Sequence, residues 1–192
     1  MRYLIPLLLA AAPLFSQECS LESENASPLR VTETKIEVNG RSKKVYDILQ
    51  EDGTFGLVRK EGECFNVAVE NHTTDPLTLH WHGLILPWDQ DGVAYNSQAP
   101  IPPNHREIYN FPLKQWGTYW LHSHYGLQEQ DLMAAPLIIH RDKDENQNVV
   151  VFLEDFSFTP TAKIWQDLRA NYSKEKPSDW EHGNTLVDIQ YD

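Results

Sequence analysis

The sequence is poor in cysteine and in basic side chains. Two cysteines in 192 residues are too few for a disulfide scaffold or a zinc ribbon. Lysine and arginine total 16 against 28 aspartates and glutamates, which gives a formal net charge of −12 at pH 7. Such an acidic chain has no general attraction to phosphate backbones or anionic lipids, so nucleic acid is not expected as a partner.

A long hydrophobic run is also lacking. The apolar stretch at residues 3–15 follows Arg2 and falls short of the roughly 20 residues that cross a bilayer. A basic residue before a short apolar run is typical of a secretory signal. We therefore expect a signal peptide at 1–16, no stable membrane anchor, and a periplasmic or secreted protein. Export to an oxidising compartment would permit a Cys19–Cys64 bridge, and the sequence leaves that pairing open.

Short segments of alternating hydrophobicity dominate the chain from about residue 29 to residue 140. Turn signals such as Asn39-Gly40 and Asp91-Gly92 separate them. Regular short strands with few helical patterns favour a β-sandwich or barrel. The segments that alternate are 32–38, 65–70, 77–82, 107–111 and 119–124. We expect an all-β domain at 30–141, preceded by a mobile N-terminal segment at 17–29.

Residues 142–192 have a different character. A charged hinge leads to an expected strand at 149–153, a helix that begins near residue 160 and runs to Asn171, and a last strand at 186–191. About 50 residues cannot build a second sandwich of similar size. We expect this part to be a short strand and helix extension that leads toward a second domain missing from the chain.

Two His-x-His motifs carry the chemistry, His80 with His82 and His122 with His124. On a strand, side chains at i and i+2 project from the same face, about 6.6 Å apart along it. If the two strands are neighbours, four imidazoles line one surface. Imidazole binds copper, zinc, iron and nickel, and copper(II) is favoured among them. The spacing suits adjacent metals in a cluster better than a single ion, and the sequence lacks the His-Glu-x-x-His motif of zincins.

The segments that contain these motifs resemble the N-terminal cupredoxin-like domain of multicopper oxidases, above all the bacterial copper-resistance and laccase-like oxidases. The two densest stretches are LHWHGLILPWDQDGV at 79–93 and GTYWLHSHYGLQEQDLMAAPLII at 117–139. The resemblance runs from about Thr32 to His140. It implies a Greek-key cupredoxin-like β-sandwich that binds copper.

The resemblance also implies roles for individual residues. By matching position, His80 would bind the type 2 copper of a trinuclear cluster, His82 and His122 one type 3 copper, and His124 the other. Asp91 matches the family's carboxylate that assists proton delivery during oxygen reduction and is the candidate catalytic residue. The alternative for Asp91 is a turn residue before glycine.

The chain also departs from the family pattern. Family oxidases complete the cluster with further His-x-His motifs in their last domain, where they also hold a type 1 copper. This chain has neither, and its other histidines, expected at the surface or in linkers, are His72, His105, His140 and His182. The resemblance therefore implies half of a cluster, and the chain alone should not be an active oxidase.

Three hypotheses stay open at this point. The favoured one is a half-oxidase that needs the missing domains in trans or in an intact gene. The second is an exported, non-catalytic copper-binding module that buffers or delivers the metal. The third is a degenerate product that binds no metal. A homo-oligomer that assembles a site from several copies is also possible, so the sequence leaves undecided whether the chain is an enzyme.

Overall fold

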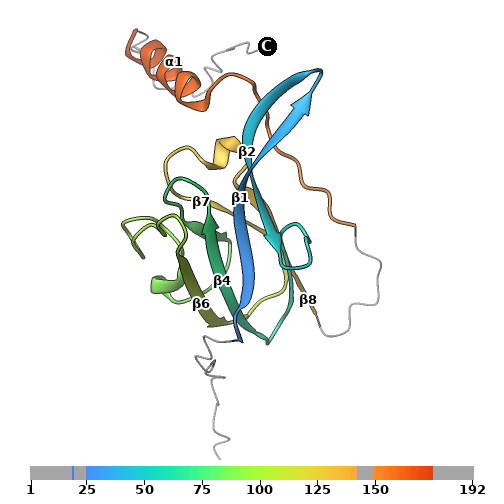
Figure 1. Cartoon of the computed structure of the whole chain (residues 1–192). Coiled ribbons are helices and arrows are strands. Elements are labelled where there is room, and N and C mark those ends of the chain that lie inside the picture. The colour runs from blue at the N-terminus through green and yellow to red at the C-terminus, as the bar shows by residue number, and fades with distance from the viewer. Residues whose placement is uncertain (1–18, 20–24, 142–148, 175–192) are drawn as a thin grey trace, which may run out of the picture.

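The structure is a computed structural model that describes Cys19, residues 25–141 and residues 149–174. The expected signal peptide and the expected last strand at 186–191 lie outside these ranges. Within them, two four-stranded sheets form a sandwich (Figure 1). One helix, α1 (Thr161–Lys174), lies at the same end of the sandwich as the β1–β2 hairpin. None of the helices described is long and apolar enough to cross a membrane.

The first sheet has the strand order β2-β1-β4-β6. Its strands are β1 (Ser27–Val38), β2 (Arg41–Gln50), β4 (Cys64–His72) and β6 (Arg106–Pro112). β1 pairs antiparallel with β2 and parallel with β4, and β4 pairs antiparallel with β6. β1 begins at Ser27, inside the segment 17–29 that we expected to be mobile.

The second sheet has the order β3-β8-β7-β5. Its strands are β3 (Leu57–Lys60), β8 (Ala134–His140), β7 (Gly117–Ser123) and β5 (Leu79–His82). Successive strands move from one sheet to the other between β2 and β7, which is the Greek-key manner of building a sandwich. The all-β, cupredoxin-like fold class expected from the sequence is confirmed. Two short 3-10 helices, η2 (Trp88–Gln90) and η3 (Glu129–Asp131), lie in the loops that follow β5 and β7.

The core between the sheets is built from alternate residues of their strands. Leu79 and Trp81 of β5 are fully buried, and the Trp81 ring packs at 4.7 Å on Phe65 of β4 in an edge-on contact. Phe65 in turn stacks on Phe111 of β6 at 4.6 Å. Because side chains alternate along a strand, burying residues 79 and 81 turns His80 and His82 to the other face.

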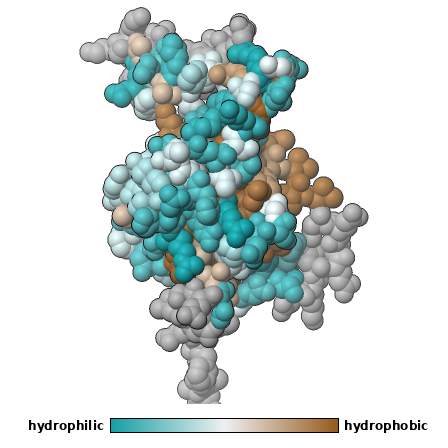
Figure 2. All heavy atoms as spheres, in the orientation of Figure 1, coloured by the Kyte–Doolittle hydropathy of each residue, from teal (hydrophilic) through white to brown (hydrophobic). Residues whose placement is uncertain are grey.

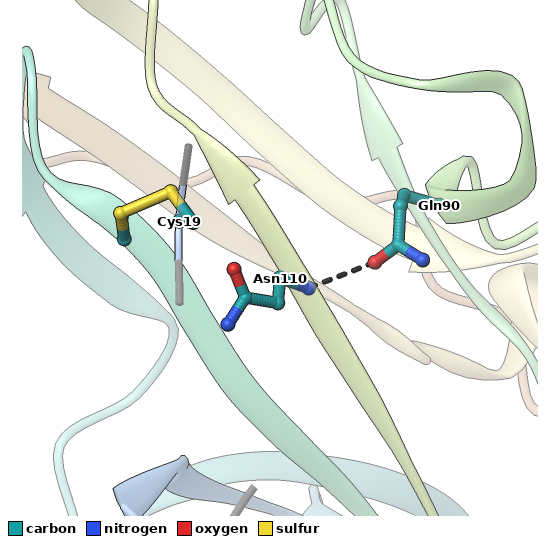
Figure 3. The surroundings of a disulfide bond; sticks show 4 residues. Cys19, Gln90 and Asn110 are labelled. Atoms are coloured by element: carbon teal, nitrogen blue, oxygen red, sulfur yellow. Dashed lines mark hydrogen bonds between the residues drawn. A yellow bond between two sulfur atoms is a disulfide. The ribbon is translucent and has the colours of Figure 1, made fainter. Parts of the chain in front are cut away.

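The disulfide left open by the sequence is formed. Cys19 and Cys64 are bonded, with their Cα atoms 5.7 Å apart, so Cys19 is tied to the first residue of β4 (Figure 3). Next to the bridge, the backbone N–H of Asn110 in β6 donates to the side-chain oxygen of Gln90 at 2.8 Å. This bond fastens η2, the element just before Asp91, to the first sheet.

The C-terminal extension differs in part from expectation. The helix is confirmed, but the strand expected at Val149–Leu153 is wrong: these residues are assigned to no strand and pair with none of the strands described. Val149, Val151 and Leu153 are 78%, 74% and 87% exposed and contribute to an apolar surface patch (Figure 2). Strand propensity reflects packing on a pleated surface, and among the described residues no strand pairs with this segment.

Candidate metal centre

The pairing of β5 with β7 gathers the four motif histidines. His80 lies directly opposite His122 in the antiparallel ladder, and His124 follows the last residue of β7. The ring of His80 lies 5.7 Å from that of His82, 5.5 Å from that of His122 and 4.6 Å from that of His124, measured between centroids. The expectation that the two strands are neighbours, with the imidazoles on one surface, is met.

Three of these rings offer nitrogens that converge. One ring nitrogen each of His80, His82 and His122 lies within 4.8 Å of the other two. His82 Nδ1 and His122 Nε2 are 3.3 Å apart. Two nitrogens bound at about 2.0–2.1 Å to one ion in tetrahedral geometry would themselves be about 3.3–3.4 Å apart. The donor set therefore fits a metal, and His82 with His122 has the spacing of two ligands of the same ion.

The outer nitrogen of His80 is held by the loop after β5. Its Nδ1 lies 2.8 Å from the backbone carbonyl oxygen of Asp91 and 3.2 Å from the carboxylate of the same residue. A carbonyl oxygen only accepts hydrogen bonds, so Nδ1 carries the proton and Nε2 keeps its lone pair for a metal. Asp91, singled out in the sequence for proton delivery, thus also orients a candidate ligand.

His122 is held in the same way by Glu129, which the sequence analysis missed. Its Nδ1 lies 3.0 Å from Glu129 Oε2, and the Nδ1–H group donates a hydrogen bond to the carboxylate. His122 Nε2 is thereby left as an acceptor that faces His82. Glu129 sits in η3, seven residues after His122. The two residues belong to different elements, so the periodicity of a single strand or helix does not relate their side chains. The acidic run that begins at Glu129 was the one local signal.

Burial affects the protonation of the site. Desolvation lowers the pKa of His122, against the carboxylate of Glu129, which raises it, and the neighbouring histidines lower it further. The pKa of His124 is lowered by desolvation and by His80. Metals bind the neutral imidazole, so both shifts keep these rings in the binding form at lower pH.

Trp120 packs against two rings of the cluster. It lies opposite His82 in the ladder, and its ring stacks on that of His122 at 4.0 Å with an interplanar angle of 11°. The His82 ring is 5.0 Å away from it. This contact restrains the ring plane of His122.

The remaining histidines lie elsewhere. His72 and His105 are exposed; His72 contacts Glu70 at 3.1 Å and His105 contacts the carbonyl oxygen of Pro103 at 2.9 Å. His140 ends β8, and His182 lies beyond the described residues. None of the three described belongs to the converging group, as the sequence analysis expected.

The close approach of the Asp91 loop to β5 depends on Gly92. Its φ is +72°, and a Cβ atom there would lie 1.8 Å from the backbone oxygen of Leu79. Gly92→Ala is therefore expected to lower the free energy of unfolding by roughly 3 kcal/mol or more, through backbone strain and the displaced strand. Gly126→Ala is the matched control, because Gly126 has φ +61° and open space around its Cβ position. Gly126→Ala should lower the free energy of unfolding, measured by urea denaturation, by about 1–2 kcal/mol. Equal losses in the two variants would contradict the packing argument.

Comparison with known proteins agrees with this site. The family profile described as multicopper oxidase matches residues 30–144. The copper resistance protein A of Escherichia coli is 36% identical over 159 residues, which cover 78% of this chain and 26% of that protein. A copper resistance protein A homolog of Pseudomonas syringae pv. tomato is 33% identical, over 81% of this chain and 26% of its own length.

A solved structure supports the same assignment. A multi-copper oxidase from Pseudomonas thermotolerans aligns with a TM-score of 0.55 and 28% identity, over 59% of this chain and 29% of its own. The chain thus spans about a quarter of the length of the two curated relatives. The profile match covers more than half of the chain and includes all four histidines. The chain belongs to the multicopper oxidase family, whose metal is copper.

Proposed function

We propose that the chain is the copper-binding N-terminal domain of a multicopper oxidase and supplies half of the histidine ligands of a type 2/type 3 trinuclear cluster. The observation that carries the proposal is the pair of His-x-His motifs on adjacent strands, with nitrogens of His82 and His122 3.3 Å apart. When bound, copper supplies the electron-transfer chemistry for reduction of oxygen. His80 would bind the type 2 ion, His82 and His122 one type 3 ion, and His124 the other.

Asp91 has a position suited to proton delivery as well as orientation. Its carboxylate lies 3.2 Å from His80 Nδ1 and is about one-third exposed, so it contacts both the site and bulk water. It therefore lies between solvent and the cluster, on a path by which protons could reach the site. Its backbone carbonyl meanwhile fixes the tautomer of His80. We propose Asp91 as the proton-delivering residue on this side of the site.

We further propose that the rest of the cluster comes from another polypeptide or domain that carries the missing histidines and a type 1 site. The surface beside the motifs is suited to such an interface. His82 is exposed, and around it in the chain lie the exposed apolar residues Ile85, Trp88 and Tyr95. Tyr95 contacts Tyr125, next to His124, with ring centroids 6.4 Å apart. Apolar exposed patches of this kind mark interaction sites.

Export to the periplasm or the cell exterior remains our proposal for localisation. The basic residue and apolar run in residues 1–16 support it. The Cys19–Cys64 bridge supports it as well, because disulfides persist in oxidising compartments. Copper would then be loaded outside the cytoplasm.

The test mixes the chain with a polypeptide that carries the missing histidine motifs and type 1 site. The chain alone is expected to bind copper and consume no oxygen with a phenol or copper(I) as reductant, whereas the copper-loaded mixture consumes oxygen. The control mixture contains the His80→Ala/His122→Ala variant and should be inactive. Stable association and copper binding without oxygen uptake would reject the half-oxidase and favour the copper-buffering module. A melting temperature unchanged by excess copper would reject both, because a ligand of the native state must stabilise it.

A further inference from the structure

The short helix η3 contacts the metal centre on one side and the C-terminal extension on the other. Its first residue, Glu129, accepts a hydrogen bond from Nδ1–H of His122 at 3.0 Å. Its last residue, Asp131, meets Lys43 of β2 at 2.9 Å and accepts a hydrogen bond from the hydroxyl of Thr161, the first residue of α1, at 2.5 Å. Three segments distant in sequence thus meet at one helical turn.

The loop that carries η3 is fixed at its base as well. The buried side chain of Gln128 accepts from Ser123 Oγ at 2.7 Å and donates to the backbone oxygen of Pro76 at 2.9 Å. Gln128 therefore fixes the start of η3, and Lys43 and Thr161 fix its end. Between these anchors, Glu129 has a defined position relative to His122.

The bond from Glu129 decides which nitrogen of His122 is available. The ring is 4% exposed, stacked on Trp120, and committed at Nδ1 to the carboxylate. Its Nε2 then points to His82 Nδ1, where the metal would lie. Removing the carboxylate would leave the ring plane restrained by Trp120 but the tautomer free to change.

We propose that Glu129 is a positioning residue for His122, and that Thr161 acts through Asp131 to hold Glu129 in place, so that the extension supports the metal centre. The proposal rests on the proposed role of His122 as a copper ligand. Thr161 lies beyond residues 30–144, the part that matches the family profile. Lys43 also faces the extension, because its Nζ lies 5.6 Å from the centre of the Phe156 ring. The extension is therefore part of the support of the site as well as a connecting segment.

The first test measures copper(II) affinity of the full chain by chelator competition. Glu129→Ala is expected to weaken binding by about 10–100-fold, the usual effect of removing a partner of a ligating histidine. Glu129→Gln should weaken binding less, because the amide oxygen can still accept a hydrogen bond from Nδ1–H. Glu154→Gln is the matched control: Glu154 lines the same cavity of about 510 Å³ as Glu129 and should leave affinity unchanged. Wild-type affinity in Glu129→Ala would overturn the proposal.

A double-mutant cycle tests the connection to Thr161. Thr161→Val alone should lower copper affinity, by less than Glu129→Ala does. If Thr161 acts through Glu129, Thr161→Val should have little further effect in the Glu129→Ala background, because residues in one network are non-additive. Fully additive effects, or no effect of Thr161→Val, would overturn this part of the proposal.

A measurement without copper separates this proposal from the proposed function. In ¹⁵N NMR of the metal-free protein, His122 is expected as the Nδ1–H tautomer in the wild type and as a mixture in Glu129→Ala. An unchanged tautomer in Glu129→Ala would reject the positioning role even if copper binds. A shifted tautomer in a protein that binds no copper would reject the proposed function alone. Should Glu129→Ala fail to fold, the same shift is sought in Glu129→Gln and Thr161→Val.

Discussion

Replacing His122 with alanine is expected to lower the affinity of the chain for copper(II) by at least about 100-fold, the upper end of what loss of a supporting residue costs. His122 is the least exposed of the four motif histidines and the one best held, by Glu129 and by Trp120. Its Nε2 is the nitrogen that approaches His82 at 3.3 Å. Without it, the pair formed by His82 and His122, whose nitrogens have that spacing, is lost.

The matched control is His72→Ala. His72 also contacts a carboxylate, that of Glu70 at 3.1 Å, but on the first sheet and outside the converging group. Affinity is measured by chelator competition, and the rise in melting temperature on copper addition gives an independent measure. The wild type and His72→Ala should both be stabilised, and His122→Ala should not. Equal affinity of the three proteins would mean that copper binds elsewhere.

The direction of the histidines could be predicted from sequence because β5 alternates strictly. Leu79 and Trp81 are large and apolar, so they had to enter the core, and the pleat then placed His80 and His82 on the other face. The same reasoning applied to β7, where Leu121 is buried. The alternation of buried and outward-facing side chains depends only on neighbouring residues of one strand. The sequence alone therefore predicts which way such side chains face.

Other elements have no such pattern. Six of the seven residues of β8 are buried, because the strand lies between β3 and β7 within its sheet and is covered on both faces. Its sequence therefore reads as an apolar run without alternation. Val149–Leu153 has the composition of such a strand but pairs with none of the strands described, because composition alone does not bring a segment to the edge of a sheet.

The residues that hold the candidate ligands in place could not all be predicted from the sequence, for a different reason. Asp91 was found because it follows the first motif in a turn that the family resemblance covers. Glu129 lies in a loop, and Thr161 begins a helix 30 residues after its partner Asp131. Their contacts with His122 and Asp131 depend on how the two sheets and the extension pack. Only the assembled structure places them together.

The sequence likewise left the Cys19–Cys64 pairing open, and the structure shows that the bond is formed. Its loss is expected to lower the free energy of unfolding by about 4 kcal/mol, from the loop-closure entropy of a cross-link that spans 45 residues. Cys19→Ser/Cys64→Ser and the reduced wild type should therefore unfold at lower urea concentration than the oxidised wild type. The variant should be insensitive to reductant, which serves as the control. Equal midpoints for the oxidised wild type and the variant would contradict the prediction.

The same variant separates stability from metal binding. Cys64 begins β4 in the first sheet, whereas the four histidines belong to β5, β7 and the residue after β7, on the second sheet. The bridge therefore ties Cys19 to the first sheet, whereas the ligands stand on the second. Below its unfolding transition, Cys19→Ser/Cys64→Ser should bind copper(II) with the affinity of the wild type. A large loss of affinity in the folded variant would show that the bridge also shapes the metal site. The separation of stability from metal binding would then be wrong.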